Sequence, residues 1–279
     1  MPFNMNRTWS QAVALVRANS QLLAIIAGVF LLLPALLFAF LMPETIDWSR
    51  LGQDSEEISQ QMEGMLGPLL IYGLVSFVLQ LIGYGAMVAL IGEDRPTVGE
   101  AIVLGLRSLP TIIAATLLFA LAYLAVALIA GVIVGAISAA GAGGLAAAIA
   151  FVVVAALFIG VLYVITRLSL TLPVVVLEGV RNPVTALRRS WLLTKQQGGA
   201  IFGFYVLLFI AYFVISMLLF GVVGVIGAMF GPGPAAALFT GLVNGIIGAL
   251  AAMVMSGILV SMHQQLAGRS GAALGETFR

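Results

Sequence analysis

The sequence has no cysteine, a single histidine and few charged residues. Its 279 residues include 12 Lys and Arg and 11 Asp and Glu, so only 8% are charged, whereas 62% are hydrophobic. Without cysteine there is no disulfide framework and no thiolate metal site, and one histidine cannot build a histidine-rich metal site. A net charge of +1 gives no electrostatic basis for binding nucleic acid. We therefore expect no metal, no cofactor and no nucleic-acid partner.

Six apolar stretches dominate what is present. A soluble domain carries about 25% charged residues, and a membrane span needs about 20 mostly apolar ones. The stretches cover residues 21–42, 67–91, 111–137, 145–166, 201–229 and 237–262. The end of the fourth is the least sharp, because Arg167 and Pro173 interrupt an apolar run that continues to Leu177. The sequence predicts an all-α integral membrane protein with six transmembrane helices.

The distribution of lysine and arginine predicts the orientation. These residues concentrate on the cytoplasmic side of membrane proteins. With the N-terminus inside, eleven of the twelve fall in inner segments, and only Arg50 falls in an outer one. Six spans place both termini on the same side. We therefore expect a multi-pass protein of the bacterial inner membrane with cytoplasmic N- and C-termini.

Three inner segments start in a similar way. Residues 8–13, 97–102 and 182–187 each begin with a helix-capping residue and then place alanine and an aliphatic residue at fixed offsets. The first two read as capping boxes, in which Gln11 or Glu100 reaches back to the threonine three residues earlier. The third combines an Asn182 cap with proline at the first helical position. Chance similarity among short helix starts is the alternative to a repeat.

Each start leads into a short amphipathic helix and then two spans. The sequence therefore predicts a single membrane domain, 1–279, built from three parallel repeats, 8–92, 97–177 and 182–265, with a polar tail at 266–279. The short helices are expected to lie in the membrane interface. Parallel repeats imply an approximate axis along the membrane normal.

The third unit carries the most specific pattern. Residues 172–179 read LPVVVLEG, Asn182 and Pro183 follow, and residues 186–195 read ALRRSWLLTK. These residues resemble the membrane-domain family that is fused to glycerophosphoryl diester phosphodiesterases and also occurs in standalone bacterial proteins. The close resemblance covers about 25 residues and implies an integral membrane domain of unassigned biochemical role. The phosphodiesterase activity of fused relatives belongs to a soluble barrel, for which no segment here is long or polar enough.

The same unit supplies the first set of candidate functional residues. They share a position at the inner membrane interface: Glu178, Arg181, Arg188, Arg189, Trp191 and Lys195. The basic side chains can bind anionic lipid phosphate. The alternative is that Glu178 forms an ion pair that docks the short helix on the fourth span, while the cations only anchor the topology.

Polar residues inside or beside the spans form the second set. Gln80 and Asn244 lie within spans and are either functional or hydrogen-bonded between helices. His263 lies at the inner end of the sixth span with no acid nearby in sequence, so it is expected to be an interfacial polar residue. Glycine series in the third, fifth and sixth spans predict close helix packing or, alternatively, helix bending. These series are Gly131 and Gly135; Gly221, Gly224 and Gly227; and Gly241, Gly245 and Gly248.

No catalytic motif occurs in the chain. The sequence therefore favours a non-catalytic membrane protein, a scaffold or accessory domain in envelope or membrane-lipid homeostasis. A transporter or lipid-handling carrier is the alternative. The expected partners are membrane lipids, anionic ones among them, and a membrane protein or a second copy of the chain.

Overall fold

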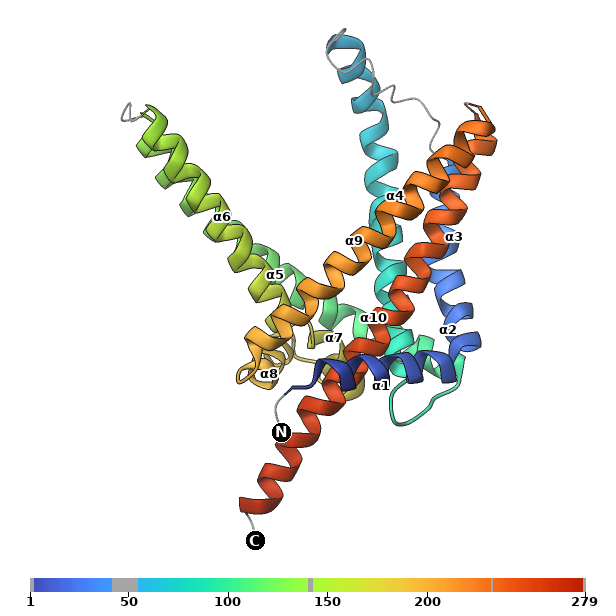
Figure 1. Ribbon diagram of the computed structural model, residues 1–279, viewed down its shortest axis with the longest axis vertical. Helices are drawn as coiled ribbons and strands as arrows, with labels where there is room; N and C mark the ends of the chain where they lie inside the picture. The colour runs from blue at the N-terminus through green and yellow to red at the C-terminus, as the bar shows by residue number, and fades with distance from the viewer. Residues whose placement is uncertain (1–2, 42–54, 140–142, 232, 278–279) are drawn as a thin grey trace. The chain divides into compact units, whose positions relative to one another are not determined.

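A computed structural model describes residues 3–41, 55–139, 143–231 and 233–277 (Figure 1). These residues form helices and turns, with no strand among them, so the all-α prediction is confirmed. Six helical stretches are long and apolar enough to cross a membrane, as predicted. They are Ser20–Phe40, Leu66–Leu90, Val98–Ile137, Ala147–Leu177, Gly198–Met229 and Ala235–Gly268.

The first span is made of three consecutive elements. Helix α1 (Met5–Ala18) precedes it, and α2 (Ser20–Ala27), the π-helical turn η1 (Gly28–Leu32) and α3 (Leu33–Leu41) build it. Pro34 explains the widened turn, because proline has no N–H and its ring collides with the carbonyl group four residues earlier. The Tyr72 hydroxyl donates a hydrogen bond to the Pro34 carbonyl oxygen at 2.6 Å.

The remaining elements include four long helices and two short ones. The long helices are α4 (Ser55–Leu90), α5 (Val98–Ala139), α9 (Gly198–Met229) and α10 (Pro234–Thr277). Helix α6 (Gly143–Leu168) is followed by the short helices α7 (Thr171–Leu177) and α8 (Pro183–Thr194).

The chain divides into two compact units. The first contains Met1–Met5, Pro110–Leu207 and Met262–Arg279, and the second contains Asn6–Leu109 and Leu208–Ser261. Helices α5, α9 and α10 contribute residues to both. Every candidate residue of the predicted interface group belongs to the first unit.

Glycine allows close helix packing in the second unit. A β-carbon on Gly245 of α10 would lie 2.5 Å from Leu32 Cδ1, and one on Gly241 would collide with Ala39. The predicted packing role is therefore confirmed for these two glycines. A β-carbon on Gly131, Gly135 or Gly248 would meet nothing within 4 Å, so the close packing predicted there is wrong.

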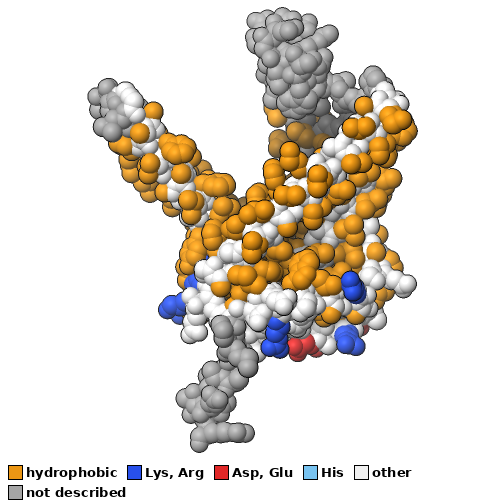
Figure 2. Space-filling view, in the orientation of Figure 1, with side chains coloured by type: hydrophobic (Ala, Val, Ile, Leu, Met, Phe, Trp, Pro, Cys, Tyr) orange, Lys and Arg blue, Asp and Glu red, His pale blue; other side chains and the backbone are white. Residues whose placement is uncertain are grey.

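The α5–α6 hairpin of the first unit exposes hydrophobic side chains along its length (Figure 2). Val132 is 72% exposed and Phe151 75% exposed. In water such a surface would be strongly unfavourable, whereas acyl chains solvate it. The hairpin is therefore a lipid-facing element.

Two of the three predicted helix starts are confirmed. Glu100 Oε2 accepts a hydrogen bond from Thr97 N at 2.8 Å, and Thr97 Oγ1 accepts one from Glu100 N at 3.4 Å, which together form the second capping box. The Asn182 side chain accepts from Val184 N at 3.0 Å and caps α8. The box predicted at residues 8–11 is wrong, because α1 begins at Met5 and Thr8 lies buried inside it.

The second short helix is not separate from its span. Helix α5 runs from Val98 to Ala139 with Pro110 inside it. A proline removes one helix hydrogen bond but leaves the turns on either side intact. The short helix and the third span, which were expected to be separate, are therefore one continuous helix. The threefold repeat itself stays a prediction.

Candidate functional site

Local backbone geometry places Glu178 at a sharp reversal of the chain. Its N–H bonds to the Val174 carbonyl oxygen at 3.2 Å and closes α7. Gly179 follows with φ of +68°, the left-handed conformation in which glycine ends helices. Four residues after Glu178, Asn182 caps α8. Helices α7 and α8 therefore pack against each other with Glu178 at the turn between them.

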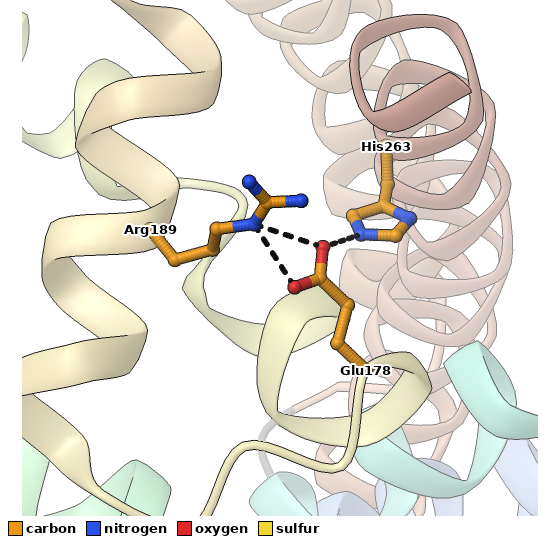
Figure 3. Close-up of polar contacts among 3 residues, drawn as sticks. All are labelled: Glu178, Arg189 and His263. Atoms are coloured by element: carbon orange, nitrogen blue, oxygen red, sulfur yellow. Dashed lines mark hydrogen bonds and ion pairs between the residues drawn. The ribbon is translucent and has the colours of Figure 1, made fainter. Parts of the chain in front are cut away.

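The Glu178 carboxylate joins side chains from three segments of the first unit (Figure 3). Its Oε2 lies 3.0 Å from Arg189 Nε of α8. Its Oε1 lies 2.9 Å from His263 Nε2 of α10. An ionised carboxylate only accepts hydrogen bonds, so His263 Nε2 carries the proton in this contact. This trio is called the Glu178 cluster below.

Charge and burial act in opposite directions on Glu178. Its side chain is 23% exposed. Burial raises the pKa of this carboxyl, but hydrogen bonds from Arg189 and His263, with the positive charge beside them, lower it by more. The pKa therefore lies below its usual value of 4.5, and the cluster holds Glu178 ionised.

The ion pair between Glu178 and a basic residue of α8 is of the kind that the sequence predicted. The contact of Glu178 with His263 was not predicted. Glu178 pairs with a basic residue of the short helix and fastens α8 to the end of α7. His263 is buried, and its partner acid lies 85 residues away in sequence. No acid lies near His263 in sequence, as noted above, but the fold brings Glu178 to it. A helical sequence does not reveal a contact of this separation.

A second set of contacts fastens α8 to α6. The Arg167 carbonyl oxygen accepts hydrogen bonds from Ser190 Oγ at 3.0 Å and Thr194 Oγ1 at 3.1 Å. The Arg167 guanidinium carbon lies 4.4 Å from the centroid of the Trp191 ring, within the range of a cation–π interaction. Arg167 was not among the predicted site residues, although its position inside an apolar run was the available signal.

Helix α8 is thereby fixed with one face inward and the other outward. The buried residues of the inward face are Ala186, Ser190, Leu193 and Thr194, so this face combines two hydroxyl groups with apolar side chains. Val184, Arg188, Trp191 and Lys195 follow at helical positions i, i+4, i+7 and i+11, which share one face. All four are exposed. This set is called the outer face of α8 below.

The other predicted residues lie elsewhere. The Arg181 carbonyl oxygen, in the turn before α8, accepts from Thr111 Oγ1 of α5 at 2.9 Å. In the second unit, Gln80 of α4 is exposed. Asn244 of α10 is half-buried, and its enclosed Oδ1 has no hydrogen-bond partner in the described part of the chain. The structure therefore brings together Glu178, Arg189 and His263, and leaves Gln80 outside this cluster.

The chemistry available to the cluster is charge compensation. Among residues 3–41, 55–139, 143–231 and 233–277, no group of three or more His, Asp or Glu could hold a metal ion. One carboxylate held between a guanidinium and an imidazole stabilises the contact between three segments. The exposed cations beside it can take an external anion.

Comparisons of the chain with protein-family models, with curated proteins and with solved structures found no match.

Proposed function

We propose that this chain is a non-catalytic protein of the bacterial inner membrane that binds anionic lipid at its cytoplasmic face. In this role it serves as a scaffold or accessory protein in envelope or membrane-lipid homeostasis. The observation that carries the proposal is the outer face of α8, which combines exposed basic and exposed apolar side chains on one rigidly held helix.

The pattern of exposure suits the boundary between acyl chains and headgroups. Val184 is 61% exposed and Trp191 38% exposed, and both lie on the same face as Arg188 and Lys195. Helices that lie in the membrane interface place apolar residues toward the acyl chains, while long basic side chains reach the phosphates. Tryptophan is enriched at the same depth. The outer face of α8 therefore fits an anionic lipid surface better than it fits water.

Pairing within the chain decides which cations are available. Arg189 is already paired with Glu178, with its Nε 3.0 Å from Glu178 Oε2. Arg188 and Lys195 remain exposed. Each basic residue near an anionic surface contributes about 1 kcal/mol, so these two together contribute about 2 kcal/mol, or about 30-fold in affinity.

A fixed surface supports the scaffold part of the proposal. The Glu178 cluster and the two hydrogen bonds to the Arg167 carbonyl oxygen hold α8 at several points. Because the helix is already held in place, binding a lipid does not require the conformational entropy loss of ordering it. The resemblance of residues 172–195 to the membrane domain of glycerophosphoryl diester phosphodiesterases lends support, since it covers this same helix.

Lipid binding is tested on the purified full-length chain in nanodiscs or detergent. Arg188→Gln with Lys195→Gln should weaken retention of phosphatidylglycerol about 30-fold relative to phosphatidylcholine. Arg17→Gln with Arg95→Gln is the matched control, because both of those residues are exposed and the change in net charge is the same. Equal losses in both double variants would contradict a specific role for the outer face of α8.

A transport assay distinguishes the scaffold from the alternative, a lipid carrier. A scaffold that only binds lipid leaves a fluorescent phosphatidylglycerol in the leaflet where it was placed in proteoliposomes. Protein-dependent movement of that lipid to the other leaflet would replace the scaffold proposal with the carrier.

A further inference from the structure

Arg167 carries two buried hydrogen-bond donors with no acceptor. The residue lies in the last turn of α6 and is 3% exposed. Its Nε and Nη1 are enclosed and have no hydrogen-bond partner among the described residues. A buried donor left unpaired is unfavourable, and more so when the group is charged. Such a group calls for a partner.

Aromatic contacts do not supply that partner. The guanidinium carbon lies 4.4 Å from the Trp191 centroid and 6.0 Å from the Tyr163 centroid. Tyr163 is held in turn by an edge-on contact with Phe202 of α9, with centroids 6.4 Å apart. Cation–π contacts stabilise the charge, but they act on the flat face of the guanidinium. The N–H groups lie in its plane and still need oxygen acceptors.

The first turn of α9 lies against these donors. A β-carbon on Gly198, the first residue of α9, would be 3.1 Å from Arg167 Nη1 and 3.1 Å from Tyr163 Oη. The α9 hydrogen bonds begin with Ile201 N, which bonds to the Gln197 carbonyl oxygen at 3.0 Å. The N–H groups of residues 198–200 precede that bond and have no acceptor within the helix. A helix N-terminus is also the positive end of the helix dipole.

Positive charge outnumbers negative charge around this point. The segments of the first unit with described side chains hold five basic residues, Arg167, Arg181, Arg188, Arg189 and Lys195, and one acid, Glu178. That acid is already engaged by Arg189 and His263. Gln197 Oε1, beside Gly198, is an enclosed acceptor without a partner, but it carries no charge, so no described carboxylate of this unit is left to balance Arg167.

We infer that Arg167 and the N-terminal turn of α9 form a binding site for a phosphate group. The inference deepens the proposed function, because it names the group by which one bound lipid is recognised. The guanidinium donates Nε–H and Nη1–H in its plane, and the Gly198–Gly199 amides add donors that no β-carbon covers. Tyr163 and Trp191, both partly exposed, lie beside the guanidinium. The phosphate belongs either to a phospholipid headgroup or to a soluble phosphate ester.

The lipid source is tested by counting bound phosphatidylglycerol on the full-length protein with native mass spectrometry. Arg167→Met should weaken the tightest phosphatidylglycerol about 10- to 100-fold, as expected for lost hydrogen bonds to a charged group. Arg188→Met is the matched control, since it removes an exposed cation of α8 and should cost about fivefold. Phosphatidylcholine serves as the zwitterionic reference lipid.

Gly198→Ala provides a second variant that keeps the guanidinium. Its methyl group would press on Arg167 and Tyr163, so the tight site should weaken although the net charge is unchanged. This variant keeps the test decisive even where Arg167→Met prevents folding, which size-exclusion chromatography and circular dichroism would reveal.

The soluble source is tested by calorimetric titration of the detergent-purified protein with inorganic phosphate and with glycerol 3-phosphate. Binding that is lost in Arg167→Met and Gly198→Ala supports the site and assigns it to soluble phosphates. Loss confined to phosphatidylglycerol supports the site and assigns it to the lipid. Wild-type binding of every probe by both variants, or no binding of any probe by the wild type, would overturn the inference.

The two proposals fail in different ways. If Arg188→Gln with Lys195→Gln releases the lipid while Arg167→Met retains it, the phosphate site is refuted and the outer face of α8 stands. If Arg167→Met releases the lipid while that double variant retains it, the phosphate site stands and the proposed role of the outer face is refuted.

Discussion

Removing the Glu178 carboxylate tests whether three segments are fastened at one point. Glu178→Ala deletes the acceptor for Arg189 of α8 and for His263 of α10. The substitution leaves the apolar surface of the spans unchanged. Its effect therefore reports the cluster and not the packing of the membrane helices.

The magnitude follows from the exposure of the two partners. The Arg189 side chain is 37% exposed, so its ion pair is screened and contributes at most about 1 kcal/mol. The His263 side chain is only 9% exposed, and a buried N–H left without an acceptor costs about 1–3 kcal/mol. The two losses in the free energy of unfolding sum to about 1–4 kcal/mol, and at about 2–4 °C per kcal/mol for a large chain the Tm should fall by several degrees.

Intrinsic tryptophan fluorescence during thermal unfolding of the purified protein measures this loss. Arg188→Ala is the control, because it changes an exposed charge on the same helix outside the cluster. In a double-mutant cycle, His263→Ala should cost much less in the Glu178→Ala background than in the wild type. An unchanged Tm for Glu178→Ala, or additive losses in the cycle, would refute the cluster as a fastening point.

Three further predictions concern pH, packing and capping. Folding lowers the pKa of Glu178, so the stability that its carboxylate contributes is present above pH 4.5 and is lost as the pH falls through the lower pKa of the folded state. The Tm difference between wild type and Glu178→Ala should therefore shrink in acid. A difference that grows in acid would contradict the lowered pKa. Gly245→Ala should lower the free energy of unfolding by about 1–3 kcal/mol, because the added methyl group collides with Leu32. Gly131→Ala places its methyl group in open space, so in the same thermal melts it should be neutral or slightly stabilising. Asn182→Ala should cost about 1 kcal/mol by removing the α8 cap, and an unchanged Tm would count against that cap.

The spans were predictable because hydropathy is a property of each stretch by itself. An apolar run of sufficient length has to be helical in lipid, since every backbone polar group must be paired within the segment. Local caps were predictable for the same reason, as at Thr97 and Asn182. The start of α1 was not, because Thr8 resembles a cap in sequence while the helix begins three residues earlier.

The site was predictable only where its members are close in sequence. Glu178 and Arg189 are separated by 11 residues across one turn, so their pairing follows from the reversal at Gly179. His263 was missed because its contact with Glu178 depends on how distant helices pack. Arg167 was counted as an inner-face cation, yet packing of α8 over it made it a buried one.

The proposed lipid binding requires six membrane crossings with the basic segments on the cytoplasmic side. The chain has no cysteine, so single substitutions report position without background. A membrane-impermeant maleimide applied to intact cells should label Asp54→Cys and should reach Lys195→Cys only after the membrane is opened. Labelling of both positions from the outside of intact cells would contradict the topology and, with it, the placement of every lipid-binding residue.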